Sequence, residues 1–213
     1  MHIYAFGSIC RGEVDASSDI DMLAIVNGYD SRFNPRDYSV YSYERIHDLW
    51  NQGNPFAWHL FLESKLVYSQ DVIDFLKSIG EPSTYKFGIE DCEKFREIFS
   101  SARESIDCSD LTEIFDLSSI FLAVRNFATC YSLHSELAPD FSRNSARNLG
   151  NHSIPIDAST YSLLERSRVL CTRGLGEILS SAEIDAAKKT LGEIDSWMAG
   201  ILKIMKNDIY ERI

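Results

Sequence analysis

Two short apolar runs near the start of the chain frame the feature that most constrains its fold. Residues 2–6 (HIYAF) and 20–26 (IDMLAIV) are rich in β-forming residues, and a Gly- and Ser-containing connection separates them. Gly7 and Ser8 follow the first run directly. Because glycine has no side chain, a phosphate can approach the backbone there, and Ser8 adds a hydroxyl and a backbone N–H. The pattern predicts two strands joined at a phosphate-binding turn.

A pair of carboxylates stands at the beginning of the second apolar run. Asp19 and Asp21 are two residues apart, so in a strand both project from the same face, while Ile20 and Met22 are expected in the core. Two adjacent anions repel each other unless a cation joins them, and carboxylate oxygens suit Mg²⁺. This chemistry indicates attack on the α-phosphate of a nucleotide, with metal ions aligning the triphosphate and the nucleophile.

The rest of the chain divides into an α/β part and a helical part. Before residue 86 the pattern predicts two further strands, over 38–43 and 65–68. It also predicts three helices, over 43–51, 55–64 and 71–79. Beyond residue 86, apolar residues at three- and four-residue spacing predict helices over 89–106, 111–133, 160–179 and 182–210, with a structured loop over 138–157. We therefore expect an α/β domain over 1–85 and a helical domain over 86–213.

Charge and cysteine content narrow the classes of function. The chain has 32 Asp and Glu against 21 Lys and Arg, and its net charge of −11 argues against a broad nucleic-acid-binding surface. The five cysteines form no CxxC pair, which fits neither a zinc site nor a disulfide framework and suits a reducing compartment. Without a signal-peptide pattern or a membrane-spanning apolar run, we expect a cytoplasmic protein with no membrane partner.

The run GSICRGEVDASSDIDMLAIV (residues 7–26) resembles the signature of the nucleotidyltransferase superfamily, in which Gly-Ser precedes Asp-x-Asp by about ten residues. It is most similar to the small prokaryotic branch, where an Arg-Gly pair follows the Gly-Ser, as Arg11-Gly12 does here. The resemblance implies a polymerase-β-like mixed sheet of the α/β (α+β) class, an NTP donor and Mg²⁺ or Mn²⁺. It also implies that Asp19 and Asp21 bind metal, and that nucleotide contacts come from Gly7, Ser8, Arg11 and Ser18.

The same family places a third carboxylate on a later strand, and Asp37 in PRDYSVYS is the best-placed candidate. Asp37 and Ser39 share a strand face with Tyr41, so Asp37 would reach the metals if that strand begins early. The alternative is an exposed aspartate that opens the strand. A chain lacking this carboxylate would bind nucleotide without turning it over.

Two further groups of residues are candidates for acceptor or phosphate contacts. His59 and Glu63 lie four apart on one helical face, where they would line the acceptor side of the cleft or form a partly buried pair. In the helical domain, Arg143 and Arg147, with Arg125, would neutralise the triphosphate or bind the acceptor.

A competing hypothesis uses the segment Arg147–His152. An arginine followed by a histidine five positions later resembles the ribonuclease motif of the helical HEPN superfamily. That resemblance implies an Arg that holds the scissile phosphate and a His that performs acid–base chemistry on the 2′-hydroxyl. Gly150 and Pro155 indicate a loop here rather than a helix.

The hypothesis that we favour from sequence is a metal-dependent nucleotidyltransferase that moves an NMP from an NTP to an acceptor and releases pyrophosphate. The acceptor stays open among a protein, an RNA end such as that of tRNA, and a small molecule. The alternatives are a HEPN-like ribonuclease and a non-catalytic nucleotide-binding antitoxin or sensor. Family analogy adds a protein partner of the kind found in toxin–antitoxin and phage-defence pairs.

Overall fold

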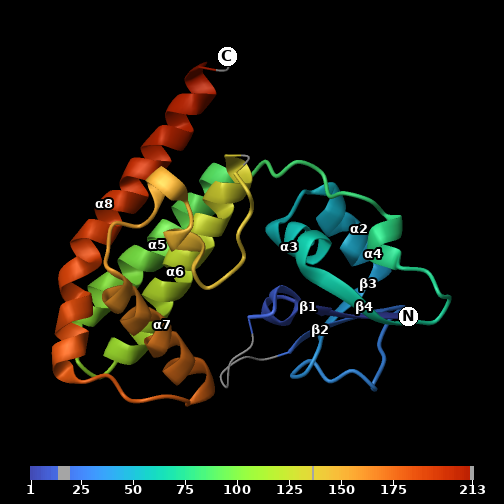
Figure 1. Cartoon of the computed structure of the whole chain (residues 1–213), viewed down its shortest axis with the longest axis horizontal. Helices are drawn as coiled ribbons and strands as arrows, with labels where there is room; N and C mark the ends of the chain where they lie inside the picture. The colour runs from blue at the N-terminus through green and yellow to red at the C-terminus, as the bar shows by residue number, and fades with distance from the viewer. Residues whose placement is uncertain (14–19, 136, 212–213) are drawn as a thin grey trace. The chain divides into compact units, whose positions relative to one another are not determined.

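The computed structural model describes residues 1–13, 20–135 and 137–211, so the predicted site residues Ser18 and Asp19 lie outside the described part. The chain forms two compact units, Met1–Lys86 and Phe87–Ile213, which differ in architecture. The first unit is built on a sheet and the second is made of helices (Figure 1). The mixed sheet followed by helices confirms the predicted fold class.

A four-stranded mixed sheet forms the centre of the first unit, in the order β3-β2-β1-β4. Its strands are β1 (His2–Phe6), β2 (Asp21–Val26), β3 (Ser39–Ser42) and β4 (Ser64–Ser69). β1 runs antiparallel to both of its neighbours, and β2 runs parallel to β3. In this register Phe6, the last residue of β1, lies opposite Asp21, the first residue of β2. The end of β1 and the start of β2 are therefore adjacent.

Helices α2, α3 and α4 cover one face of this sheet (Figure 1). In the described part of this unit the helices are α1 (Ser8–Arg11), α2 (Tyr43–Asn51), α3 (Pro55–Glu63) and α4 (Phe75–Ser78). Side chains fix the starts of two of them: Ser42 Oγ accepts a hydrogen bond from Arg45 N, and Asn54 Oδ1 from Phe56 N. The helix predicted over 71–79 begins only at Phe75, because Asp74 caps it by accepting from Lys77 N.

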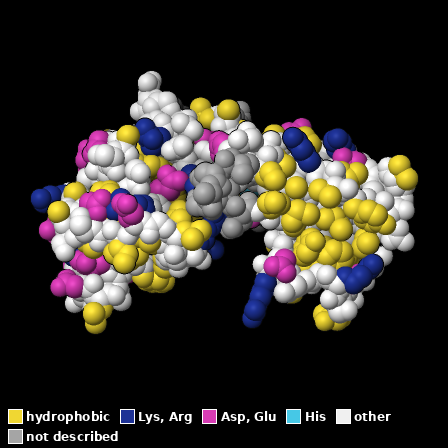
Figure 2. All heavy atoms as spheres, turned by 60° about the horizontal axis from the view of Figure 1, so that its bottom comes forward, with side chains coloured by type: hydrophobic (Ala, Val, Ile, Leu, Met, Phe, Trp, Pro, Cys, Tyr) yellow, Lys and Arg dark blue, Asp and Glu magenta, His cyan; other side chains and the backbone are white. Residues whose placement is uncertain are grey.

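The core of the first unit lies between the sheet and these helices. It includes the alternate residues Tyr4 and Phe6 of β1, Leu23 and Ile25 of β2, and Leu60 of α3. This alternation follows from the two-residue period of a strand, which sends every second side chain to the helical face. Hydrophobic side chains also gather on the surface of this unit that faces the viewer in Figure 2.

The expectation that Ile20 points into the core was wrong. Ile20 precedes β2, which begins at Asp21, and 60% of its surface is exposed. Met22 is half-buried. Outside the strand, Ile20 has no regular pleat to turn its side chain inward, whereas the four β2 residues from Leu23 onward are buried.

The second unit consists of four helices and two short 3₁₀ turns. The helices are α5 (Gly88–Cys108), α6 (Glu113–His134), α7 (Ala158–Arg173) and α8 (Ser181–Glu211), and the turns are η1 (Ser145–Arg147) and η2 (Gly150–His152). α6 is buried over most of its length, including Leu117, Ile120 and Phe127. Nowhere in the described residues does a helix combine the length and the apolar character that crossing a membrane requires.

Helix α7 ends earlier than its hydrophobic pattern predicts. The prediction extended to residue 179, but the helix stops at Arg173 because Gly174 adopts the left-handed conformation, with φ of 63°. Its N–H donates to Leu170 O at 2.9 Å, as in an αL cap. Beyond Gly174 only Leu179 of the apolar residues before α8 is buried, whereas Leu175 and Ile178 are exposed, so the apolar spacing there belongs to a loop and not to a helix.

Candidate active site

Gly7 forms a turn between β1 and α1. Its φ of 75° and ψ of −142° belong to a region that residues with a Cβ rarely adopt. The Gly7 N–H donates to Glu63 O at 3.1 Å, and Gly7 O accepts from Cys10 N at 2.9 Å. Ser8 begins α1 and is half-buried. The backbone conformation by itself therefore favours a glycine at position 7.

Asp21 lies directly against this turn. A Cβ atom built on Gly7 would lie 2.8 Å from Asp21 Oδ2, so no larger residue could occupy position 7 unless the carboxylate moved. Asp21 itself is exposed, because β2 begins there and its following residues enter the sheet. The structure thus brings together Gly7 and Asp21, two members of the predicted site that are separated by most of the motif.

Arg11, Glu63 and His59 form a cluster beside the Gly7 turn. The Glu63 carboxylate makes an ion pair with Arg11 Nη1, and its Oε2 lies 3.0 Å from His59 Nε2. Arg11 Nε also donates to Glu13 Oε2 at 2.9 Å. Only 13% of the Glu63 side chain is exposed, and the Arg11 and His59 side chains are almost as buried. The Arg11 guanidinium balances the charge of this buried carboxylate, and the His59 ring lies beside it.

The surroundings of Arg11 hold it in the charged form. Burial alone lowers the pKa of its guanidinium, but the hydrogen bond with Glu13 and the charge of Glu63 outweigh this effect and raise the pKa above its usual value. Cys10, in the same helix, has a thiol pKa that burial raises, and its Sγ donates to Ala5 O at 3.3 Å. The site therefore offers a fixed cation and no activated thiolate.

His59 packs edge-on against Phe6, with the ring centroids 5.6 Å apart. Its Nε2 lies 3.8 Å from the position that a Gly7 Cβ would take, so His59 and Asp21 are neighbours across the turn. The partly buried His59–Glu63 pair that the helical spacing allowed is thus present, and it adjoins the Gly7 turn. Sequence alone did not indicate that Arg11 joins this pair, because Arg11 and Glu63 are 52 residues apart.

Asp37 lies in a turn that precedes β3. Its N–H donates to Asn34 O at 2.9 Å, and its side chain is exposed. β3 begins at Ser39, so the strand does not start early enough to contain Asp37. Extending the parallel register, in which Leu23 faces Ser39, would bring residue 37 level with Asp21. Asp37 therefore stays a candidate third carboxylate at the same end of the sheet.

The described residues fit a hard divalent cation only in part. Among them, no three His, Cys, Asp or Glu side chains come close enough together to hold a metal ion. Asp21 supplies a carboxylate beside a turn with no side chain in the way, and this donor suits Mg²⁺ or Mn²⁺. Its predicted companion, Asp19, lies outside the described residues.

The arginines predicted in the helical unit make contacts within that unit. Arg125 donates to the backbone carbonyls of Phe141 and Ser142, so it holds the loop that follows α6. Arg143 Nη1 lies 3.2 Å from Glu165 Oε1. The exposed Arg147 places its guanidinium 5.8 Å from the ring centre of Tyr161.

Arg147 and His152 lie on the two consecutive 3₁₀ turns, which confirms that this segment is a loop and not a helix. The loop is closed by a hydrogen bond of 2.8 Å from Ile154 N to Ala146 O. The His152 ring packs edge-on against Tyr131, and His152 O accepts from Trp197 Nε1 at 2.8 Å.

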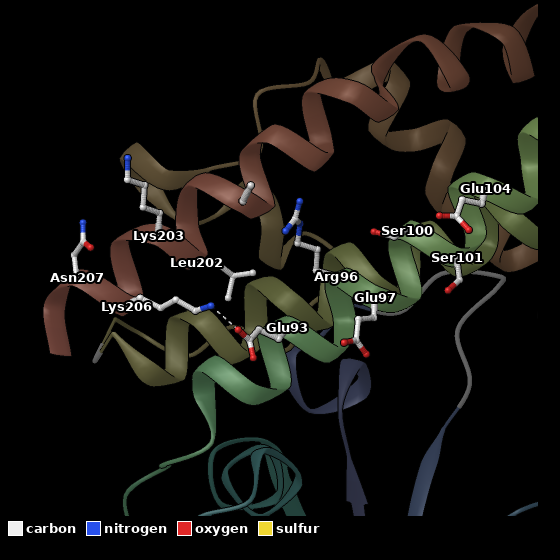
Figure 3. A pocket seen from close by; sticks show the side chains of 11 residues that line it. Glu93, Arg96, Glu97, Ser100, Ser101, Glu104, Leu202, Lys203, Lys206 and Asn207 are labelled. Carbon is white, nitrogen blue, oxygen red and sulfur yellow. Dashed lines mark ion pairs between the residues drawn. The ribbon is translucent and has the colours of Figure 1, made fainter. Parts of the chain in front are cut away.

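A groove of about 830 Å³ runs between α5 and α8 in the helical unit (Figure 3). Its walls carry both signs of charge, and Lys206 Nζ lies 2.5 Å from Glu93 Oε1 across it. None of the predicted site residues that the structure describes lines this groove.

Comparison with known protein families identifies the part of the chain that contains the Gly7 turn. Residues 2–91 match the family model described as a nucleotidyltransferase domain. The matched segment includes the whole sheet with Gly7, Arg11, Asp21, His59 and Glu63. No curated protein matches the chain significantly.

Proposed function

Because residues 2–91 of this chain are a nucleotidyltransferase domain and the protein is therefore a transferase, we propose which reaction it catalyses. It moves an NMP from an NTP to an acceptor and releases pyrophosphate. The observation that carries the proposal is the contact between the Gly7 turn and Asp21, where a Cβ would lie 2.8 Å from the carboxylate. This proximity supports the proposal because a phosphate at the Gly7 backbone would lie beside a carboxylate oxygen that would bind the metal. The backbone and the metal are both needed at the α-phosphate.

Asp19, Asp21 and Asp37 would hold the metal, Mg²⁺ or Mn²⁺, at the end of the sheet where β2 begins. When bound, such ions neutralise phosphate charge and lower the pKa of a coordinated hydroxyl. Asp21 contributes a carboxylate whose position is limited by the Gly7 backbone. Asp37 would complete the set from the turn before β3.

The triphosphate would lie along the turn and the first residues of α1. Gly7 and Ser8 offer a backbone without obstruction and a hydroxyl, and Ser18 would add a second hydroxyl. Arg11 supplies a positive charge that Glu63 and Glu13 hold in place. A guanidinium is well suited to phosphate because its planar donors match phosphate oxygens in pairs.

The acceptor would approach from the side of His59 and Glu63, and Arg143 and Arg147 are further candidates for contacts with it or with phosphate. The net charge of −11 disfavours a long RNA and favours a protein side chain, a small molecule or an RNA end such as that of tRNA. A protein acceptor would also be the natural partner if the protein acts in a toxin–antitoxin or phage-defence pair.

A labelling experiment tests this proposal. The purified protein is incubated with each α-labelled NTP, with Mg²⁺ or Mn²⁺, and with a lysate separated into protein, RNA and small molecules. We expect label in one fraction, and we expect Asp21→Asn to abolish it. Asp48→Asn, an exposed aspartate on α2, is the matched control and should label normally. An NTP that binds without any label being transferred would contradict the proposal.

The ribonuclease alternative rests on the resemblance of Arg147 and His152 to the HEPN motif, although both lie on short 3₁₀ turns and not on a helix. It predicts RNA cleavage that is lost in His152→Ala and kept in Asp21→Asn, the reverse of the transferase. A nucleotide-binding antitoxin or sensor would instead bind an NTP and a partner protein without producing pyrophosphate.

A further inference from the structure

We propose that Glu63 is the positioning residue of the NTP site, because it holds both ends of the segment Gly7–Arg11 that would meet the triphosphate. This inference rests on the proposed function. At one end, Glu63 O accepts a hydrogen bond of 3.1 Å from Gly7 N. At the other end, the Glu63 carboxylate forms an ion pair with Arg11 Nη1.

The sheet explains why one residue can do both. In the antiparallel pair of β1 and β4, Phe6 lies opposite Ser64, so the hydrogen bond between Gly7 and Glu63 continues that pairing by one residue. Glu63 is also the last residue of α3. Its backbone is therefore fixed by two elements, and its side chain crosses to the end of α1.

The cluster presents Arg11 in a defined orientation. Its Nε is bound to Glu13 and its Nη1 to Glu63, and neither of these ion pairs between described residues uses Nη2. His59 Nε2 lies 3.0 Å from Oε2, the same Glu63 oxygen that pairs with Arg11. A guanidinium that is already oriented loses less conformational freedom when an anion binds, which increases affinity.

Simple electrostatic repulsion by Glu63 would have the opposite effect on NTP affinity, so the two roles can be distinguished by experiment. A carboxylate beside a triphosphate site repels the ligand if it does nothing else. Removing its charge would then tighten NTP binding. If the Glu63 carboxylate positions Arg11, removing its charge weakens binding despite the relief of repulsion, while the backbone bond from Gly7 N to Glu63 O is kept. The sign of the change in affinity distinguishes the two roles.

The test measures the Kd of an NTP analogue that cannot be cleaved between its α- and β-phosphates, with Mg²⁺, by calorimetry on the full chain. For Glu63→Gln, which keeps the shape of the side chain, we expect binding about ten-fold weaker. Glu113→Gln is the matched control, because Glu113 is similarly buried and pairs with Lys188 in the helical unit. It should leave the Kd unchanged while lowering the thermal unfolding temperature by a comparable amount.

A double-variant cycle separates positioning from independent contact. Because Glu63 acts through Arg11, the double variant Glu63→Gln/Arg11→Gln should bind no more weakly than Arg11→Gln alone. A Glu63→Gln protein that binds the analogue as tightly as the unmodified chain, or more tightly, overturns the inference and leaves the proposed function standing. Failure of the unmodified chain to bind any NTP analogue overturns both.

Discussion

Replacing Gly7 with alanine perturbs the site through one added methyl group. The residue would keep a φ of 75°, in a region that costs about 1–3 kcal/mol for a residue with a Cβ. The new Cβ would also lie 2.8 Å from Asp21 Oδ2. An ordinary nonbonded contact is about 3.5 Å, so the carboxylate must move by at least roughly half an ångström.

Gly12→Ala provides the matched control at the other end of α1. Gly12 also has a positive φ, 77°, so alanine there costs about 1–2 kcal/mol of backbone strain. A Cβ on Gly12, however, has nothing within 4 Å among the described residues. Both variants place a Cβ at a positive φ, and only Gly7→Ala brings that Cβ against Asp21.

We expect the free energy of unfolding, measured in urea, to fall by about 1–3 kcal/mol in Gly7→Ala and by about 1–2 kcal/mol in Gly12→Ala. The kcat/KM for label transfer should fall on the order of 100-fold in Gly7→Ala, because a displacement near 1 Å at reacting groups has an effect of that size. Gly12→Ala should keep most of its activity. Full activity in Gly7→Ala, or an equal loss in Gly12→Ala, would refute the argument that Gly7 fixes Asp21.

Three further predictions concern stability, pH and metal. Leu60→Ala removes a fully buried side chain and should lower the free energy of unfolding by about 2–5 kcal/mol, whereas Leu62→Ala, at a position 47% exposed, should change it little in the same urea titration. The hydrogen bond from the Ser180 backbone, with the Arg166 guanidinium, holds the pKa of Glu183 at about 2, below its ordinary 4.5. The charged form stabilises the fold above pH 4.5, and this contribution is lost as the pH falls toward 2, so Glu183→Gln should flatten the pH dependence of the urea midpoint in that window. Chelation of divalent ions should abolish label transfer without changing the circular dichroism spectrum, and added Mg²⁺ or Mn²⁺ should restore it; transfer that persists in chelator would contradict a metal-dependent reaction.

The strands and most helices could be predicted because their signals are local. The two-residue period of β1 and the three- and four-residue spacing in α5, α6 and α8 follow from which side chains face a core. Local patterns failed at element ends. Ile20 lies outside β2, and α7 stops at Gly174, because a strand start or a left-handed cap depends on one residue's backbone rather than on a repeating pattern.

The Gly-Ser and Asp-x-Asp pattern in the sequence was sufficient to indicate a nucleotidyltransferase by resemblance, and the match of residues 2–91 to that family confirms it. Only the tertiary structure showed that Glu63 joins Arg11, His59 and the Gly7 backbone. Arg11 and Glu63 are 52 residues apart, and no local pattern encodes their pairing. The pairing of β1 with β4 and the direction of α3 bring them together, and both depend on how the whole sheet packs.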